Sequence, residues 1–322
     1  MKKIERIILT SPPVSFLIRK SKKIILPGFQ GLPLYDVARF FFQQMQQVGL
    51  NERAGAISFD FLMAIPPLGI FIFTLLSNLP GSIKLYTEAL VLVKEIAPDA
   101  STYNMIKEVM DDFFSSSTSL LSFGLILAIF FSSNAMITIM RTFNKSMLHI
   151  ETEKRNFLEL RWDAIKLTVY IVILILATIF ILFSQSAVLN FITGWLNIKT
   201  NIYNWVVEVL RLLITFMFIF ISIGLIYRYA PAVEKKWKFF SPGAMLATTL
   251  IIAFTFLFSY WVNNIASYNK VYGSLGSILI LMLLIFVNSL VLLIGFELNV
   301  SISSLKSIAE KRQHSEDQMI SD

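Results

Sequence analysis

Residues 268–299, YNKVYGSLGSILILMLLIFVNSLVLLIGFELN, form the stretch that decides the fold of this chain. A Tyr/Gly-rich segment leads into about twenty apolar residues, and this run ends close to one carboxylate, Glu297. A helix of about twenty apolar residues crosses the ~30 Å hydrocarbon layer of a bilayer. A carboxylate at the end of such a helix must be paired, lie at the interface, or face a polar cavity. The stretch therefore predicts a membrane protein, without indicating a substrate.

The composition of the whole chain supports this class. Of 322 residues, 56% are hydrophobic and only 15% are charged, against about 25% charged in a soluble domain. Further apolar runs of similar length predict an all-α, polytopic membrane protein with one domain of six transmembrane helices. We place this domain at residues 54–302, with the six spans at about 54–79, 120–140, 167–192, 206–227, 242–265 and 277–302.

The remaining segments flank this domain. Residues 1–53 are basic and contain an amphipathic helix, Leu34–Gly49, which fits either the membrane interface or a site on the cytoplasmic side of the protein itself. Residues 80–119 form an outer loop with two predicted amphipathic helices, Leu85–Ile96 and Tyr103–Phe114. Residues 303–322 are a polar cytoplasmic tail.

The distribution of Lys and Arg predicts the orientation. Twenty-two of the 28 lie in the N-terminal segment, the tail and the connections 141–166 and 228–240, whereas five lie in the alternate connections. Positive residues accumulate on the cytoplasmic side of membrane proteins. Both termini are therefore expected in the cytoplasm. The net charge of +7 is explained by cations next to the membrane ends of the helices, so we expect membrane lipids, and no nucleic acid, as partners.

Several short segments, in this order, resemble the YihY/BrkB family of bacterial integral membrane proteins, which were once labelled ribonuclease BN-like. The segments are LPGF (26–29), LYD (34–36), AGAISF (54–59), IPPL (65–68), RTFNK (141–145), YRYAP (227–231), PGA (242–244), YGSLG (272–276) and GFELN (295–299). The resemblance implies a six-helix protein of the bacterial inner membrane. It implies no agreed activity, although transport of lipids or lipid-linked envelope components is compatible with it.

Two residues depart from the family pattern. Asp60 stands where an aromatic or small polar residue is more usual, and Phe296 stands where a small residue usually precedes Glu297. We therefore expect the helix packing around Glu297 to differ from that of the family.

The ionisable residues of the predicted spans are the candidate functional residues. By topology, Asp60, Arg141 and Glu297 all lie toward the cytoplasmic side, and Asn144 and Asn299 are close enough in sequence to join them. One interpretation is a polar pocket in which Arg141 faces the carboxylates and a substrate headgroup or proton exchanges among them. The other interpretation is a structural ion pair that fixes helix register.

Backbone features suggest two further candidates. Pro66 and Pro67 remove two backbone donors from the first span, so they predict a kink or break, which either lines a transport site or is an ordinary membrane proline. Tyr272, Gly273 and Gly276 predict a tight outer turn before the last span. They do not match a phosphate-binding motif.

Enzymatic chemistry has little support in the sequence. There is no cysteine, and the two histidines, His149 and His314, lie in no metal-ligand pattern. We expect no catalytic, metal-binding or cofactor-binding residues, and ribonuclease activity is not expected. The leading hypothesis is a transporter or flippase for a lipid-like or small amphiphilic envelope component. The alternative is a non-transporting scaffold for envelope assembly.

Overall fold

The computed structural model describes most of the chain as helix. The described residues are 12–77, 86–87, 89–91, 93–94, 100–114, 118–147, 150, 152–153, 155–196, 200–233, 236–264 and 274–321. Within these ranges the only extended pairing is an isolated antiparallel bridge between Thr152 and Val233. The all-α prediction is therefore confirmed for the described part of the chain.

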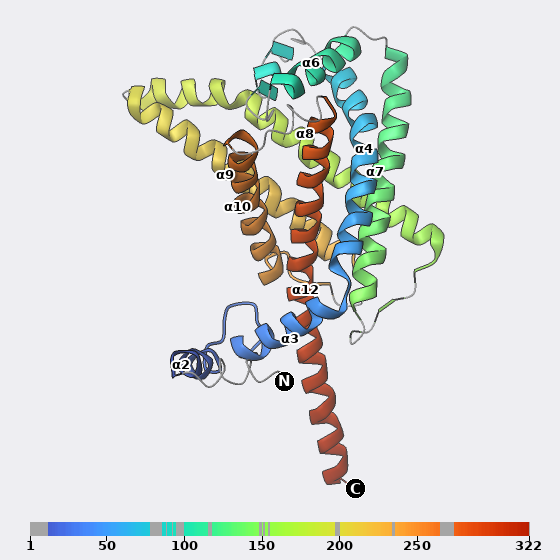
Figure 1. Cartoon of the computed structure of the whole chain (residues 1–322), viewed down its shortest axis with the longest axis vertical. Helices are drawn as coiled ribbons and strands as arrows, with labels where there is room; N and C mark the ends of the chain where they lie inside the picture. The colour runs from blue at the N-terminus through green and yellow to red at the C-terminus, as the bar shows by residue number, and fades with distance from the viewer. Residues whose placement is uncertain are drawn as a thin grey trace.

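Among the described residues, six long helices build the body of the molecule and three shorter ones lie at its two ends, as Figure 1 shows. The long helices are α4 (Leu50–Ser77), α7 (Thr118–Ser146), α8 (Phe157–Leu196), α9 (Thr200–Tyr229), α10 (Pro242–Asn264) and α12 (Ser274–Ser321). The short helices are α2 (Pro12–Ser21) and α3 (Leu34–Gln47) at one end and α6 (Ala100–Phe114) at the other. Each long helix carries one of the predicted spans.

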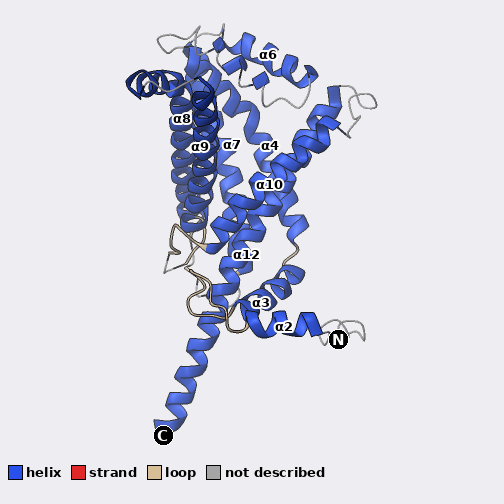
Figure 2. Cartoon of the chain, turned by 90° about the vertical axis from the view of Figure 1, so that its left-hand side faces the viewer, coloured by secondary structure: helices blue, strands red, loops and turns tan. Residues whose placement is uncertain are grey.

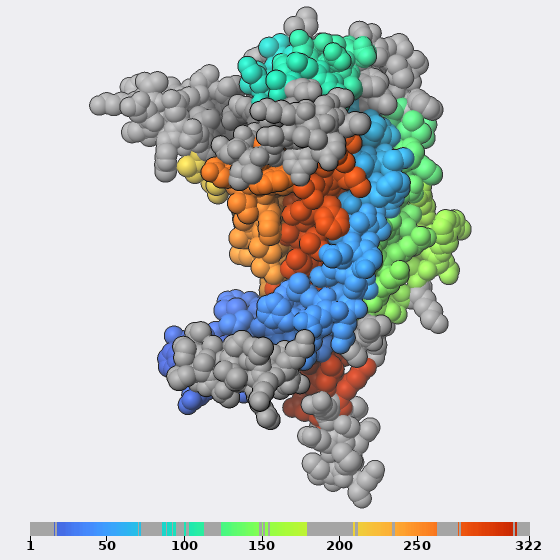
Figure 3. Space-filling view, viewed as in Figure 1, coloured from blue at the N-terminus to red at the C-terminus, as the bar shows by residue number. Residues whose placement is uncertain are grey.

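The long helices pack side by side, with α4 against α7 and α12, and α10 against α12 and α9. The face drawn in Figure 3 shows α10, α12 and α4 next to one another. Their buried side chains form one core cluster that includes Ile57, Phe143, Tyr227 and Phe296. The outward sides of the same helices are apolar as well: Ile126 is 67% exposed and Phe256 is 63% exposed. Large apolar surfaces of this kind are typical of protein in contact with lipid.

Four of the described helical segments are long and apolar enough to cross a membrane: Gly124–Ser146, Leu212–Tyr229, Pro242–Val262 and Ile278–Lys311. They lie in α7, α9, α10 and α12. The chain is thus a membrane protein with at least these candidate spans among its described residues.

The last helix differs most from its predicted bounds. We expected a span ending at Ile302 and then a polar tail, but α12 runs without interruption from Ser274 to Ser321. Residues 303–321 contain neither Gly nor Pro to end a helix, and Lys306 and Glu310 form an i, i+4 ion pair of 3.6 Å. With 48 residues the helix is about 72 Å long, so its final turns extend beyond the other long helices (Figures 1 and 2).

A short turn joins α3 to α4 and fixes their relative direction. It contains Gly49, whose φ of +60° lies in the left-handed region that residues other than glycine seldom adopt. On one face of α3, Val37 packs with Phe29 and with Ile302 of α12. On the other side Phe42 is 61% exposed. Helix α3 therefore packs on the protein itself and still leaves an apolar side chain free.

Candidate functional site

Glu297 is fully buried, with 0% of its side chain exposed, at the level where four helices meet. The Ser146 hydroxyl donates a hydrogen bond to Glu297 Oε1. Arg53 Nη1 lies 3.8 Å from the same oxygen and donates to Ser146 Oγ at 2.6 Å. The Ser146 hydroxyl therefore accepts a hydrogen bond from the Arg53 guanidinium and donates one to the Glu297 carboxylate. We name Arg53, Ser146 and Glu297 the carboxylate relay.

The relay draws its residues from both ends of the chain. Ser146 is the last residue of α7, Arg53 lies in the first turn of α4, and Glu297 lies in α12. Gln44 of α3 donates to the backbone oxygen of Ser146 at 3.2 Å, and Arg53 also approaches the oxygen of Thr142 at 3.5 Å. The turn at Gly49 brings α3 and α4 together so that both helices reach the end of α7.

One atom of the relay has no hydrogen bond of ordinary geometry among the described residues. This atom is the buried Glu297 Oε2, although the Gln44 side chain lies close enough to interact with the carboxyl group. An unsatisfied oxygen of a buried carboxylate is costly because it has lost its water and gained nothing. The arrangement therefore offers a hydrogen-bond acceptor to a proton donor or a cation that enters the site.

An aromatic cluster adjoins the relay. Phe296, the residue before Glu297, stacks on Phe143 with ring centroids 3.6 Å apart and an interplanar angle of 8°. Tyr227 lies 5.9 Å and Trp237 5.2 Å from the same ring. These four rings form an apolar wall on the side of α12 next to Glu297, and this packing holds the large side chain of Phe296.

Close packing of α10 on α12 occurs beside this wall. A Cβ at Gly243 would lie 2.7 Å from Asn299 Oδ1, and a Cβ at Gly295 would lie 2.6 Å from the backbone oxygen of Gly243. Asn299 accepts from the Gly243 amide and donates to Ser241 Oγ, both at 2.9 Å. Asn299 thus satisfies a free donor at the start of α10. It belongs to this helix contact and has no bond to the relay among the described residues.

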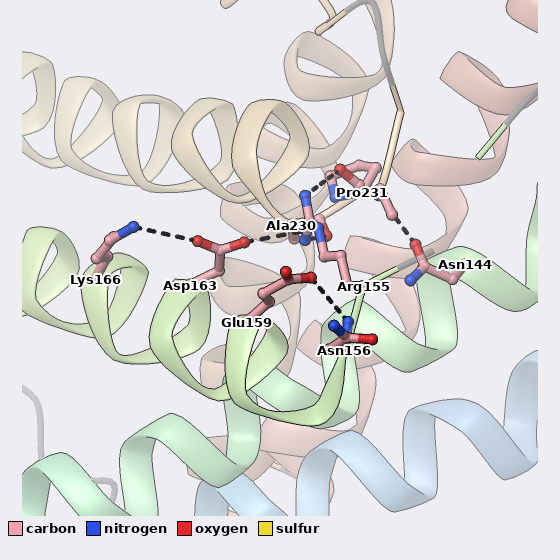
Figure 4. Close-up of polar contacts among 9 residues, drawn as sticks. Asn144, Arg155, Asn156, Glu159, Asp163, Lys166, Ala230 and Pro231 are labelled. Carbon is pink, nitrogen blue, oxygen red and sulfur yellow. Dashed lines mark hydrogen bonds and ion pairs between the residues drawn. The ribbon is translucent and has the colours of Figure 1, made fainter. Parts of the chain in front are cut away.

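A second polar cluster surrounds Arg155 (Figure 4). Its guanidinium donates to the backbone oxygens of Ala230 and Pro231 at 3.1 and 3.0 Å, just beyond the end of α9, and lies 3.6 Å from Asp163. Asn144 accepts from the amide of Ala232 at 3.1 Å, so it also binds this segment. A cation at the C-terminus of a helix complements the helix dipole and its free carbonyl groups. This cluster caps α9 and joins it to α7 and α8.

The predicted pocket residues therefore separate into different places. Asp60 accepts a hydrogen bond from Thr138 and is partly exposed. Arg141 is exposed, and the cation beside Glu297 is Arg53, which corrects the expected pairing with Arg141. The reason is rotational: Arg141 is five residues from Ser146, about 140° away around α7. Thr142, four residues from Ser146, shares its side of the helix.

The predicted backbone features have mixed outcomes. Helix α4 continues through Pro66 and Pro67, so the break that we allowed for is absent, and Pro67 is buried while Pro66 is exposed. Gly276 is buried in the first turns of α12 and is not part of a turn before it. Tyr272 and Gly273 lie outside the described residues.

Arg53, Ser146 and Gln44 were not recognised from the sequence as members of the site. Arg53 lies in the segment expected to be cytoplasmic and Ser146 in the connection expected after the second span, so the sequence alone does not bring them to Glu297. A signal was available: Thr142 and Ser146 are spaced i, i+4, so they lie on one helix face if that span continues to residue 146.

No solved structure matches the chain, but several curated proteins do. Among curated proteins, the ribonuclease-like protein YfkH of Bacillus subtilis is 28% identical over 276 residues, which cover 82% of this chain and 94% of that protein. The UPF0761 membrane protein NTHI0384 of Haemophilus influenzae is 28% identical over 291 residues, covering 87% of this chain and 98% of that protein. The UPF0761 membrane protein MS0032 of Mannheimia succiniciproducens is 24% identical over 271 residues, covering 83% and 90%.

The family described as virulence factor BrkB matches residues 41–320, which hold all six long helices and the whole carboxylate relay. The resemblance inferred from the short motifs is thereby confirmed. This chain belongs to the BrkB family of membrane proteins.

Proposed function

We propose that this protein is a transporter or flippase for a lipid-like or small amphiphilic component of the cell envelope. The observation that carries the proposal is Oε2 of Glu297, a fully buried carboxylate oxygen in a candidate membrane span that has no hydrogen bond of ordinary geometry among the described residues. Ionisable residues inside membrane proteins are costly and commonly mark a substrate or ion path. A protein that needed Glu297 only for packing gains nothing from leaving this atom without such a bond.

In the proposed mechanism Arg53 and Ser146, rather than Arg141, form the polar site with Glu297. A polar or protonated headgroup donates to Glu297 Oε2, while Arg53 and Ser146 hold Oε1. The apolar part of the solute lies against the outward faces of α10 and α12, where Phe256 and Leu257 are 63% and 62% exposed and Ile278 is 46% exposed. The solute is thus expected to combine a hydrogen-bond donor with a hydrocarbon portion.

The proposal includes six membrane crossings with both termini in the cytoplasm of a bacterial inner membrane. Helices α4 and α8, with 28 and 40 residues, are long enough to add two crossings to the four candidate spans. The excess of Lys and Arg at one end supports the orientation. Because the chain contains no cysteine, single cysteines at Glu95 and Glu310 test it directly. Labelling of Glu95→Cys, but not Glu310→Cys, by an impermeant thiol reagent in intact cells is expected; the reverse contradicts the topology.

We further propose that the protein is not an enzyme and needs no cofactor. This rests on the absence of cysteine and on the isolated positions of His149 and His314 in the sequence. The relative named ribonuclease-like is the reason to measure it: purified protein is expected to leave labelled RNA intact with and without divalent metal ions, and metal-dependent cleavage would overturn this part of the proposal.

A non-transporting scaffold is the second candidate, and one observation favours it. Several polar residues of the spans are satisfied locally. Thr138 donates to Asp60, Arg161 donates to Asn134, and Ser133 donates to the backbone oxygen of Phe130. A continuous polar path in a transporter requires Asp60, Ser133 and Asn134 to line one cavity together with Glu297. The scaffold hypothesis explains their local bonds without any solute.

Reconstitution into liposomes distinguishes the two candidates. Purified protein is expected to speed the transbilayer exchange of fluorescent lipids above protein-free liposomes, and Glu297→Gln is expected to abolish the increase. Glu310→Gln, at an exposed position of the same helix, is the matched control and is expected to keep it. Exchange by Glu297→Gln equal to the wild-type rate refutes the role of the relay. No exchange by wild-type protein across several lipid classes favours the scaffold.

A further inference from the structure

The N-terminal arm, residues 12–33, carries a surface that the proposed transport does not use. The arm consists of α2 and the following loop, and it contains four exposed cations within five residues: Arg19, Lys20, Lys22 and Lys23. We name these the arm cations. Figures 1 and 2 show α2 beside the end of the bundle, at the level of α3, and not against the long helices.

Large apolar side chains accompany the arm cations. Phe16 is 65% exposed, Ile25 is 57% exposed and Leu26 is 39% exposed. An aqueous position is unfavourable for three such side chains in one short segment. The combination of exposed apolar groups with a basic cluster is typical of segments that insert between lipid headgroups.

The depth of the arm fits the same interpretation. Gly28 lies so close to Pro242 that a Cβ on it would be 2.7 Å from Pro242 Cγ. Pro242 is the first residue of a candidate membrane span. Ile25 and Leu26, two and three residues before Gly28, are therefore held near the plane where that span leaves the hydrocarbon layer. The cations that precede them reach the headgroup layer.

We propose that the arm binds the anionic lipid headgroups of the membrane that surrounds the bundle. Phe16, Ile25 and Leu26 enter the interface, and the arm cations pair with phosphate or carboxylate groups. Lys22 also lies 5.1 Å above the ring of Tyr35, which orients it from the first turn of α3. Each cation near an anionic leaflet contributes about 1 kcal/mol, which is about fivefold in the docking equilibrium.

The arm is continuous with α3, and α3 reaches the carboxylate relay through the bond from Gln44 to Ser146. Lipid composition is thereby connected to the position of a helix that contacts the site. The binding of headgroups by the arm, however, does not depend on whether the protein transports anything, and its test uses no transport assay.

Single-cysteine labelling tests this proposal in the full-length protein. An environment-sensitive fluorophore is attached to Leu26→Cys, with Ile25→Cys as a second position in case one variant folds poorly. The protein is placed in nanodiscs of phosphatidylcholine alone or mixed with phosphatidylglycerol. With phosphatidylglycerol we expect blue-shifted emission, quenching by spin-labelled lipid, and loss of both in high salt, because salt screens the charges.

The control variants isolate the arm cations. Changing all four to Gln is expected to reduce the docked-to-free ratio by a factor of about 600, since four contributions of about fivefold multiply. Changing Lys311 and Arg312 to Gln removes two cations from α12 beyond its contact with the arm at Leu305, and is expected to leave the probe unchanged. Equal emission in the two lipid mixtures overturns the proposal, as does a water-exposed probe in both.

Discussion

The carboxylate relay predicts an asymmetric response to the loss of its two charges. Glu297 is 0% exposed, whereas Arg53 is 17% exposed. Replacing Arg53 by Gln leaves a fully buried carboxylate without its cation, for which we expect a loss of about 3–5 kcal/mol in the free energy of unfolding. Replacing Glu297 by Gln leaves a cation that still reaches water and the oxygen of Thr142, so the expected loss is only about 1–2 kcal/mol.

The double variant separates the ion pair from the individual side chains. Because Arg53→Gln is costly mainly through the carboxylate that it strands, adding Glu297→Gln is expected to recover about 2 kcal/mol of the loss. The assay is equilibrium unfolding by dodecyl sulfate in mixed micelles, followed by tryptophan fluorescence. Lys145→Gln, an exposed cation one residue from Ser146 on α7, serves as the matched control.

Two results would refute this reasoning. If Arg53→Gln is no more destabilising than Lys145→Gln, Arg53 does not compensate the buried charge. If the losses of the two single variants simply add in the double variant, the two residues are not coupled, and the relay through Ser146 has no energetic meaning.

Three further predictions concern packing, capping and the outer loop. Gly295→Ala forces a Cβ to within 2.6 Å of a backbone oxygen of α10, so we expect a loss of about 1–3 kcal/mol in the same assay. Gly55→Ala, whose Cβ would meet no atom within 4 Å, is expected to raise the stability. Equal losses for Gly55→Ala and Gly295→Ala would contradict the close approach of α10 to α12 at Gly295. Arg155→Lys replaces two planar donors by one flexible ammonium, so a loss of about 1–2 kcal/mol is expected; an unchanged midpoint argues against the cap on α9. The hydrogen bond to Asp111 raises the pKa of Tyr86 to about 12. Asp111→Asn is expected to lower this pKa toward its ordinary value, seen as a tyrosinate absorbance change at lower pH than in wild type, and identical titrations contradict the contact.

Much of the architecture could be predicted from local properties of the sequence. The apolar runs that end near Met140, Tyr227 and Asn299 correspond to helices α7, α9 and α12, because the length of an apolar run and its cost in water do not depend on distant residues. The bounds were less predictable. Helix α12 continues beyond Ile302 because the residues after it favour helix. The edge of the hydrocarbon layer does not by itself end a helix.

The candidate site was predicted only in part. Glu297 could be recognised because a carboxylate at the end of an apolar run is conspicuous in any fold, but the run left open whether it is paired, lies at the interface or faces a polar cavity. Arg141 was the expected cation because it is close to a span end. The choice between Arg141 and Arg53, however, depends on how α7 is rotated about its axis, and proximity in sequence contains no information about that angle.

The sequence by itself therefore determined that this is a helical membrane protein and that Glu297 must be paired, lie at the interface or face a polar cavity. Only the tertiary structure decided that Arg53 and Ser146 supply it, that Asn144 and Asn299 belong to helix contacts elsewhere, and that Asp60 bonds with Thr138. The physical reason is that insertion into a membrane follows from the hydropathy of one segment. Which side chains contact Glu297 depends on the register and rotation of several helices. These are fixed by packing between residues as distant in the chain as Arg53 and Glu297.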